Sequence, residues 1–175
     1  MRKILISVTG LVCIVLFDVH AVIASLLMLG MVPFMRIFVI LGIVLMCLLL
    51  LHAVFSLPFF IVRSLKSKEH YFRLNAEAVL QAVTGILFVV FLFYHPYYTS
   101  HKPALWNLGI IVISLAGAGL HLFLGLPRGM ISLGLVREEA DMKKARFIAF
   151  LLTAIPVLLA VYAYISYYPQ YYAGG

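Results

Sequence analysis

The segment from Ile37 to Val62 reads IFVILGIVLMCLLLLHAVFSLPFFIV and contains no Asp, Glu, Lys or Arg. A helix needs about 20 predominantly apolar residues to cross the hydrocarbon layer of a membrane. This segment therefore predicts a transmembrane helix. Its one histidine, His52, falls near the middle of that helix. Ionisable side chains at membrane depth are costly and usually have a function.

The whole chain has the composition of a membrane protein. Of its 175 residues, 65% are hydrophobic and 11% are charged, whereas about 25% of the residues in a soluble domain are charged. Its length allows a single transmembrane domain over 1–175. The predicted fold is all-α and integral to the membrane, with five spans at about 4–28, 37–62, 76–98, 105–127 and 146–168.

The ends of these spans give three further expectations. The first apolar run, about 25 residues, is longer than the core of a signal peptide and lacks a small-residue cleavage site, so we expect a retained first span. Acidic residues make the last connection hydrophilic, and 129–142 is expected to form a short surface helix. Cys13 and Cys47 lie in apolar runs, which favours buried small hydrophobes over a disulfide or a metal pair.

Basic residues give the orientation, because Lys and Arg concentrate in cytoplasmic loops. The net charge is +7, but the basic residues are confined to short loops, which argues against a nucleic-acid surface. Arg36 and Lys102 fall on one predicted side of the membrane. All the others fall on the opposite side: Arg2, Lys3, Arg63, Lys66, Lys68, Arg73, Arg128, Arg137, Lys143, Lys144 and Arg146. We therefore expect a cytoplasmic N-terminus and an external C-terminus, where Tyr164 to Tyr172 fit an interfacial aromatic belt.

Four of the six histidines lie inside predicted spans, one in each of the first four: His20, His52, His95 and His121. At about 1.5 Å per residue, His20 and His95 fall in the outer half of the membrane. His52 and His121 fall in the inner half. Each depth therefore holds one histidine pair, contributed by two different helices.

Two pairs at two depths favour two bis-histidine haems b, held by the first four helices. A haem iron takes axial imidazoles, and helix bundles present such ligands from their interior. The two depths, roughly 10–20 Å apart, would form an electron path across the membrane. A lone intramembrane histidine is more often a packing residue or part of a proton path. Zinc would require a third or fourth ligand, which neither pair has.

Glycine placement is compatible with this prediction. Gly117 and Gly125 stand four residues to either side of His121, on the same helix face. Small residues there either let a flat macrocycle approach the backbone or allow close helix packing.

Short segments around the histidines form an ordered set along the chain. They are Ser7-Val8-Thr9-Gly10-Leu11 before His20; Leu48 to Val54 around His52; Tyr71-Phe72-Arg73, Val79-Leu80-Gln81, Val83-Thr84-Gly85-Ile86 and Tyr94-His95; and Gly119 to Leu126 with Leu133-Gly134. The set resembles the single-subunit, di-haem cytochrome b anchor of succinate dehydrogenase and fumarate reductase. The resemblance covers about residues 4–136, and the fifth span fits in position only.

The resemblance implies that His20 and His95 ligate an outer, low-potential haem, and that His52 and His121 ligate an inner, high-potential one. It also implies flavoprotein and iron–sulfur subunits at the cytoplasmic face, and electron exchange with menaquinone or another quinone. The chain would be a subunit without dehydrogenase chemistry of its own, in a prokaryotic inner membrane, linking the tricarboxylic acid cycle to the respiratory chain. It leaves a higher oligomer of the complex open.

The chain also departs from the family pattern. The loop 29–36 and the loop between the third and fourth spans are shorter than usual, so we expect any outer quinone site to differ from that of the family. Asp18 stands where an apolar residue is usual. A charged carboxylate in a span is costly, and Asp18 is a candidate for proton transfer at an outer quinone site.

Other polar residues are candidates for quinone or haem contacts. Glu77 and Gln81 share the face of His95 near the cytoplasmic end, where they either serve a quinone and its protons or make an interhelical hydrogen bond. Arg63 and Arg128 project from the ligand faces at the inner surface, and each either pairs with a haem propionate or only sets the topology. The two external cations, Arg36 and Lys102, are the default partners for outer propionates.

Two other functions remain open. The chain has no dinucleotide fingerprint and no cysteine cluster, so dehydrogenase chemistry would reside in partners. A di-haem cytochrome b for another quinone-linked dehydrogenase would use the same four histidines. A haem-free small transporter or scaffold would use them as a proton path. Transporters often show repeats with broken helices, and the two halves of this sequence show no matching Gly/Pro-interrupted pair.

Overall fold

The computed structural model describes residues 2–66, 72–100 and 105–172, and within these ranges the chain is helical and forms no strand. The helices are α1 (Arg2–Met28), α2 (Arg36–Lys66), α3 (Phe72–Ser100), α4 (Leu105–Ser132) and α5 (Glu139–Tyr172). Each helix contains an apolar stretch long enough to cross a membrane. The prediction of five helical spans is confirmed, and their length and composition are those of a multi-pass membrane protein.

The short surface helix expected over 129–142 does not form. Helix α4 continues to Ser132, and Gly134 then takes a left-handed conformation with φ of 73°. The N–H groups of Gly134 and Leu135 donate to the carbonyls of Ile131 and Met130, each at 3.0 Å, which is the usual way to end a helix at glycine. The acidic residues that follow belong to the first turn of α5, where negative charge is favourable.

Helix α4 lies at the centre of the bundle, where it contacts α1, α3 and α5. The interface with α5 uses small residues, and Ala118 and Ala149 are fully buried in the core. A Cβ on Gly119 would lie 3.1 Å from Val157 of α5. Small residues let transmembrane helices approach closely, which matters because lipid supplies no hydrophobic force between helices.

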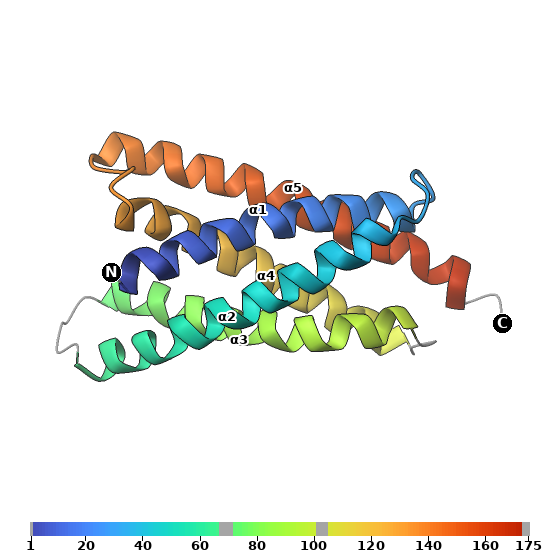
Figure 1. The fold of residues 1–175 in the computed structure, drawn as a ribbon, viewed down its shortest axis with the longest axis horizontal. Helices are drawn as coiled ribbons and strands as arrows, with labels where there is room; N and C mark the ends of the chain where they lie inside the picture. The colour runs from blue at the N-terminus through green and yellow to red at the C-terminus, as the bar shows by residue number, and fades with distance from the viewer. Residues whose placement is uncertain (1, 67–71, 101–104, 173–175) are drawn as a thin grey trace.

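Helix α2 is held differently. Over the described residues it contacts α1 and α3 but neither α4 nor α5. Figure 1 shows it running obliquely across the bundle, from beside α3 at one end to beside α1 at the other. This attachment at two edges leaves the inner side of α2 facing the centre of the bundle.

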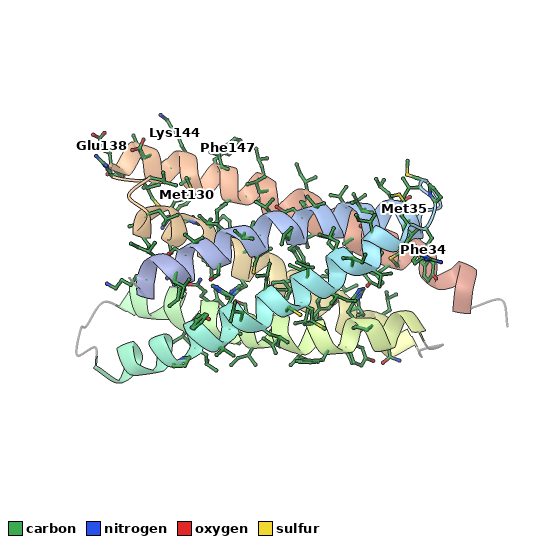
Figure 2. The ribbon with its side chains drawn as sticks, in the orientation of Figure 1. Phe34, Met35, Met130, Glu138, Lys144 and Phe147 are labelled. Atoms are coloured by element: carbon green, nitrogen blue, oxygen red, sulfur yellow. The ribbon has the colours of Figure 1, made fainter. Side chains whose placement is uncertain are left out.

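The outer surface is apolar along its length. Val54, Ile113 and Leu158 are each about two-thirds exposed (67%, 65% and 67%), a surface that suits lipid and would associate in water. Figure 2 shows Glu138 and Lys144 at one end of the bundle, and Phe34 and Met35 at the other. We name the first the basic end, which is formed by the starts of α1, α3 and α5 and the ends of α2 and α4.

Candidate functional site

Helices α1 and α2 hold their histidines in a reciprocal arrangement. A Cβ on Gly42 of α2 would lie 3.1 Å from Cε1 of His20, and a Cβ on Gly10 of α1 would lie 3.1 Å from Cε1 of His52. On each helix the glycine stands ten residues before the histidine. Because the helices are antiparallel, the two imidazoles lie at levels about 15 Å apart.

Helices α3 and α4 repeat part of this pattern. Gly85 stands ten residues before His95, and a Cβ there would lie 2.9 Å from Cε1 of His121. On α4 the equivalent position before His121 is the fully buried Ile111. Three of the four imidazoles therefore pack against a neighbouring helix at a place that has no room for a side chain.

His20 and His95 lie together at the level away from the basic end, and we name them the distal pair. Their ring centres are 6.4 Å apart and the ring planes are nearly perpendicular, at 87°. Two imidazoles on opposite sides of one metal ion, with metal–nitrogen bonds of about 2 Å, have ring centres roughly 6 Å apart. The predicted partnership of His20 with His95 is therefore present, at a spacing that suits a shared metal ion.

A cavity of about 420 Å³ adjoins the distal pair. Both imidazoles line it, and the rest of the lining is almost entirely apolar, including Phe17, Phe88 and Phe91. Phe38 of α2 stacks on His20, with ring centres 4.5 Å apart. An apolar cavity with a few convergent polar groups is the usual form of a ligand or cofactor site.

The two distal imidazoles differ in their hydrogen bonds. Nδ1 of His95 lies 2.6 Å from the hydroxyl oxygen of Tyr164, which α5 brings into the bundle. Nδ1 of His20 is buried and has no hydrogen-bond partner in the part of the chain that the structure describes. Buried polar atoms are nearly always paired, so the unpartnered Nδ1 of His20 fits a site that binds a further polar group or ligand.

His52 and His121 form the proximal pair, toward the basic end, where His52 packs against Gly10 of α1 and His121 packs against Gly85 of α3. Nδ1–H of His121 donates to the backbone carbonyl of Gln81 at 2.8 Å. Nδ1 of His52 lies 3.2 Å from Oγ1 of Thr9, whose own proton has the carbonyl of Leu5 as an acceptor at 2.9 Å. With the proton on Nδ1, Nε2 of each ring remains available as a ligand atom.

A polar cluster adjoins the proximal pair at the basic end. Arg128 donates to the side-chain oxygen of Gln81 and lies 3.5 Å from Glu77, while Arg146 of α5 lies 4.0 Å from the same carboxylate. The structure thus brings the predicted pair Glu77 and Gln81 together with Arg128. Because Glu77 is bound by two arginines, the cluster ties α3 to both α4 and α5.

The other predicted residues are more dispersed. Arg63 falls within α2, but its side chain lies outside the described residues, as does Lys102. Arg36 opens α2 and is exposed. Asp18 lies on α1, and its Oδ1 is buried without a hydrogen-bond partner among the described residues.

Glycines near the histidines divide into two groups. A Cβ on Gly117 would meet Leu87, and a Cβ on Gly125 would lie 3.1 Å from Nε2 of Gln81. These two glycines therefore serve the packing of α4 on α3, the second of the alternatives that the sequence allowed. The glycines that face imidazoles were not anticipated, although their signal is present: a glycine ten residues before the histidine in three spans.

Comparisons with known proteins give this chain no relative. No protein-family model, no curated protein and no solved structure matches it. Its function is therefore inferred from its own residues and their geometry.

Proposed function

We propose that this chain is a di-haem cytochrome b, the membrane anchor of a succinate dehydrogenase or fumarate reductase. It would pass electrons between an iron–sulfur subunit and a membrane quinone. The observation that carries the proposal is the distal pair, two imidazoles from α1 and α3 with ring centres 6.4 Å apart, both lining one apolar cavity. The proximal pair repeats the donor set about 15 Å away by helix rise.

The donor atoms suit haem b. Bis-imidazole ligation needs two neutral nitrogens and no third protein ligand, and within the described residues no three His, Cys, Asp or Glu side chains are grouped. His95, His52 and His121 each have an Nδ1 partner that orients the ring and leaves Nε2 for a metal. When bound, haem supplies one-electron redox chemistry at iron. The helices would supply imidazole ligands at two levels, and the apolar lining of the distal cavity would exclude water from that site.

The cytoplasmic orientation of the basic end follows from the excess of Lys and Arg there. Partners would bind at that end, a flavoprotein that handles succinate or fumarate and an iron–sulfur subunit. This assignment is supported by the ordered segments around the four histidines, and it implies a prokaryotic inner membrane and menaquinone or a similar quinone. Arg128 and Arg63 are then the candidates for the propionates of the proximal haem, and Arg36 and Lys102 for those of the distal haem.

Quinone contacts are proposed at two places. Gln81 and Glu77 lie in the polar cluster at the basic end, where they can bind a quinone oxygen or exchange protons. Asp18 is the candidate for proton exchange at the other end, since its carboxylate oxygen has no bonding partner among described residues. Normal quinone turnover in Gln81→Leu or Asp18→Asn protein would remove the substituted residue from the proposal.

The test is a reduced-minus-oxidised absorption spectrum, with a haem-to-protein ratio, on protein made with haem available. We expect two b-type haems per chain. The His95→Ala protein and the His52→Ala protein should each bind one haem. The controls are His70→Ala and His101→Ala, at positions between the predicted spans and outside the described residues, and both should bind two haems. Folded protein without haem would overturn the proposal and favour a proton path through the histidines.

A di-haem cytochrome b of another quinone-linked dehydrogenase would have the same haem spectrum, because the same four histidines would serve. The soluble subunits that co-purify with the tagged chain distinguish the two. Succinate dehydrogenase or fumarate reductase activity in that complex is the expected result. If the haem-loaded chain co-purified with a different dehydrogenase, the assignment as a di-haem cytochrome b would stand and the assignment to succinate dehydrogenase or fumarate reductase would be wrong.

A further inference from the structure

Helix α5 sends one polar side chain to the distal pair. Its backbone lies next to α1 and α4 but not α2 or α3 within the described ranges, and it carries no histidine. Tyr164 nevertheless reaches across to α3, where its hydroxyl oxygen lies 2.6 Å from Nδ1 of His95. The tyrosine ring is 4% exposed, belongs to the core and lines the same cavity as both distal imidazoles.

The chemistry of this contact depends on the tautomer of His95. In the tautomer that leaves Nε2 unprotonated, Nδ1–H donates to the hydroxyl oxygen of Tyr164. An acceptor at the outer nitrogen fixes the ring orientation of a metal-bound histidine and makes the ring a stronger donor to the metal. A stronger donor stabilises the oxidised metal more than the reduced one, which lowers its reduction potential.

We propose that Tyr164 is a positioning residue that holds His95 as an axial ligand and lowers the potential of the distal haem. The inference rests on the proposed di-haem function and extends it to α5, a helix that provides no ligand. Its partner in the distal pair, His20, has no Nδ1 partner among the described residues. The hydrogen bond between His95 and Tyr164 therefore gives the protein a contact through which it can adjust ligand strength at this level.

The proximal level has two kinds of Nδ1 partner. His121 donates to the backbone carbonyl of Gln81, which side-chain substitution does not remove, and His52 lies 3.2 Å from the hydroxyl oxygen of Thr9. At the distal level the acceptor is a side chain, so one substitution deletes the hydrogen bond and keeps the aromatic ring in the core. Tyr164→Phe is that substitution.

The experiment is a redox titration of the purified protein, followed at the haem absorption bands, for wild type, Tyr164→Phe and Tyr162→Phe. Tyr162 is the matched control because it lies two residues away on α5 and is 61% exposed. His95→Ala identifies which spectral component is the distal haem. We expect Tyr164→Phe to raise the midpoint potential of the distal haem by up to about 59 mV, which is a tenfold change in the oxidised-to-reduced ratio for one electron. The potential of the proximal haem, and both potentials of the Tyr162→Phe control, should stay unchanged.

Several results would overturn the inference. Both haems bound with unchanged potentials would show that the hydroxyl does not act on the ligand. If Tyr164→Phe instead shifted the midpoint potential of the haem that remains bound in His95→Ala protein, Tyr164 would act at the proximal level and not at the distal one. Loss of both haems would mean that Tyr164 supports the fold as a whole. Wild-type protein without haem would instead reject the proposed function itself, so the two failures are distinguishable.

Discussion

The distal and proximal histidine pairs place the same side chain in two different environments. The distal pair lies against an apolar cavity of about 420 Å³ with aromatic walls. The proximal pair is linked through Gln81 to Arg128, which pairs with Glu77 at the charged end of the bundle. Cofactor potentials depend on nearby charge, hydrogen bonds and burial. Under the proposed function, the bundle would therefore give two chemically identical haems different potentials through what surrounds their ligands.

The sign of that difference follows from the charges. Two arginines and one glutamate leave the polar cluster with excess positive charge, which disfavours an oxidised, more positive haem. The distal level has an apolar lining and a hydrogen-bond acceptor on its ligand. Under the proposed function, the proximal haem should have the higher potential, as the family resemblance also implies.

The most severe way to break this comparison is to remove one haem site and leave the other. In Gly85→Leu protein a Cβ alone would lie 2.9 Å from Cε1 of His121, so the leucine must displace the imidazole. We expect the haem-to-protein ratio to fall from two to one through loss of the proximal haem. Overpacking of this kind also costs about 1–3 kcal/mol of stability.

Two further variants make the glycine result specific. Gly42→Leu should remove the distal haem instead, because a Cβ there would lie 3.1 Å from Cε1 of His20. Gly109→Leu on α4 is the control, since a Cβ at that position meets nothing within 4 Å. If Gly85→Leu protein still bound two haems, the imidazole of His121 would have no role as a ligand in this position.

A smaller effect is expected when the charge near the proximal pair is changed. Arg128→Met removes a cation, its hydrogen bond to Gln81 and its ion pair with Glu77, which keeps Arg146 as a partner. The midpoint potential of the proximal haem should fall by about 59 mV, which is a tenfold change in its oxidised-to-reduced ratio. Loss of charged hydrogen bonds should lower the free energy of unfolding by about 1–3 kcal/mol.

Redox titration and thermal unfolding in detergent would measure these two effects. Arg137→Met is the matched control because that arginine is exposed, and it donates to the carbonyl of Gly134 at 3.2 Å. We expect both of its midpoint potentials to equal those of wild type. Its free energy of unfolding should match wild type within about 0.5 kcal/mol. An equal fall in both haem potentials on Arg128→Met would contradict the separation of the two environments.

The spans and the proximity of His20 to His95 are predictable because they depend on periodic, local properties. Uncharged runs of about 20 residues fix the helices, and helix rise fixes the depth of each histidine. His20 and His95 were assigned to one level by counting residues, and their rings lie 6.4 Å apart. The end of α4 was less predictable because it depends on a left-handed glycine, Gly134, within a hydrophilic stretch.

Contacts between helices far apart in the sequence were not predictable. Tyr164 was assigned to an interfacial belt, yet it is buried in the core because α5 rotates that side toward α3. Arg128 was considered for a haem propionate, and its pairing with Glu77 and Gln81 needs the relative heights of three helices. Residue spacing along a helix does not tell how that helix is rotated about its own axis relative to its neighbours, and this rotation decides which side chains meet.

The smallest expected effect concerns the hydroxyl group of Thr9. Its oxygen lies 3.2 Å from Nδ1 of His52, compared with 2.6 Å for Tyr164 and His95. Since the longer hydrogen bond is weaker, Thr9→Val should raise the proximal midpoint potential by less than Tyr164→Phe raises the distal one. Thr153→Val is the control, because that buried hydroxyl donates to the carbonyl of Ala149 at 2.8 Å. Thr9 acts at His52 and lies about 15 Å by helix rise from the level of His20. A shift in the midpoint potential of the distal haem on Thr9→Val would therefore contradict the assignment of His52 to the proximal pair.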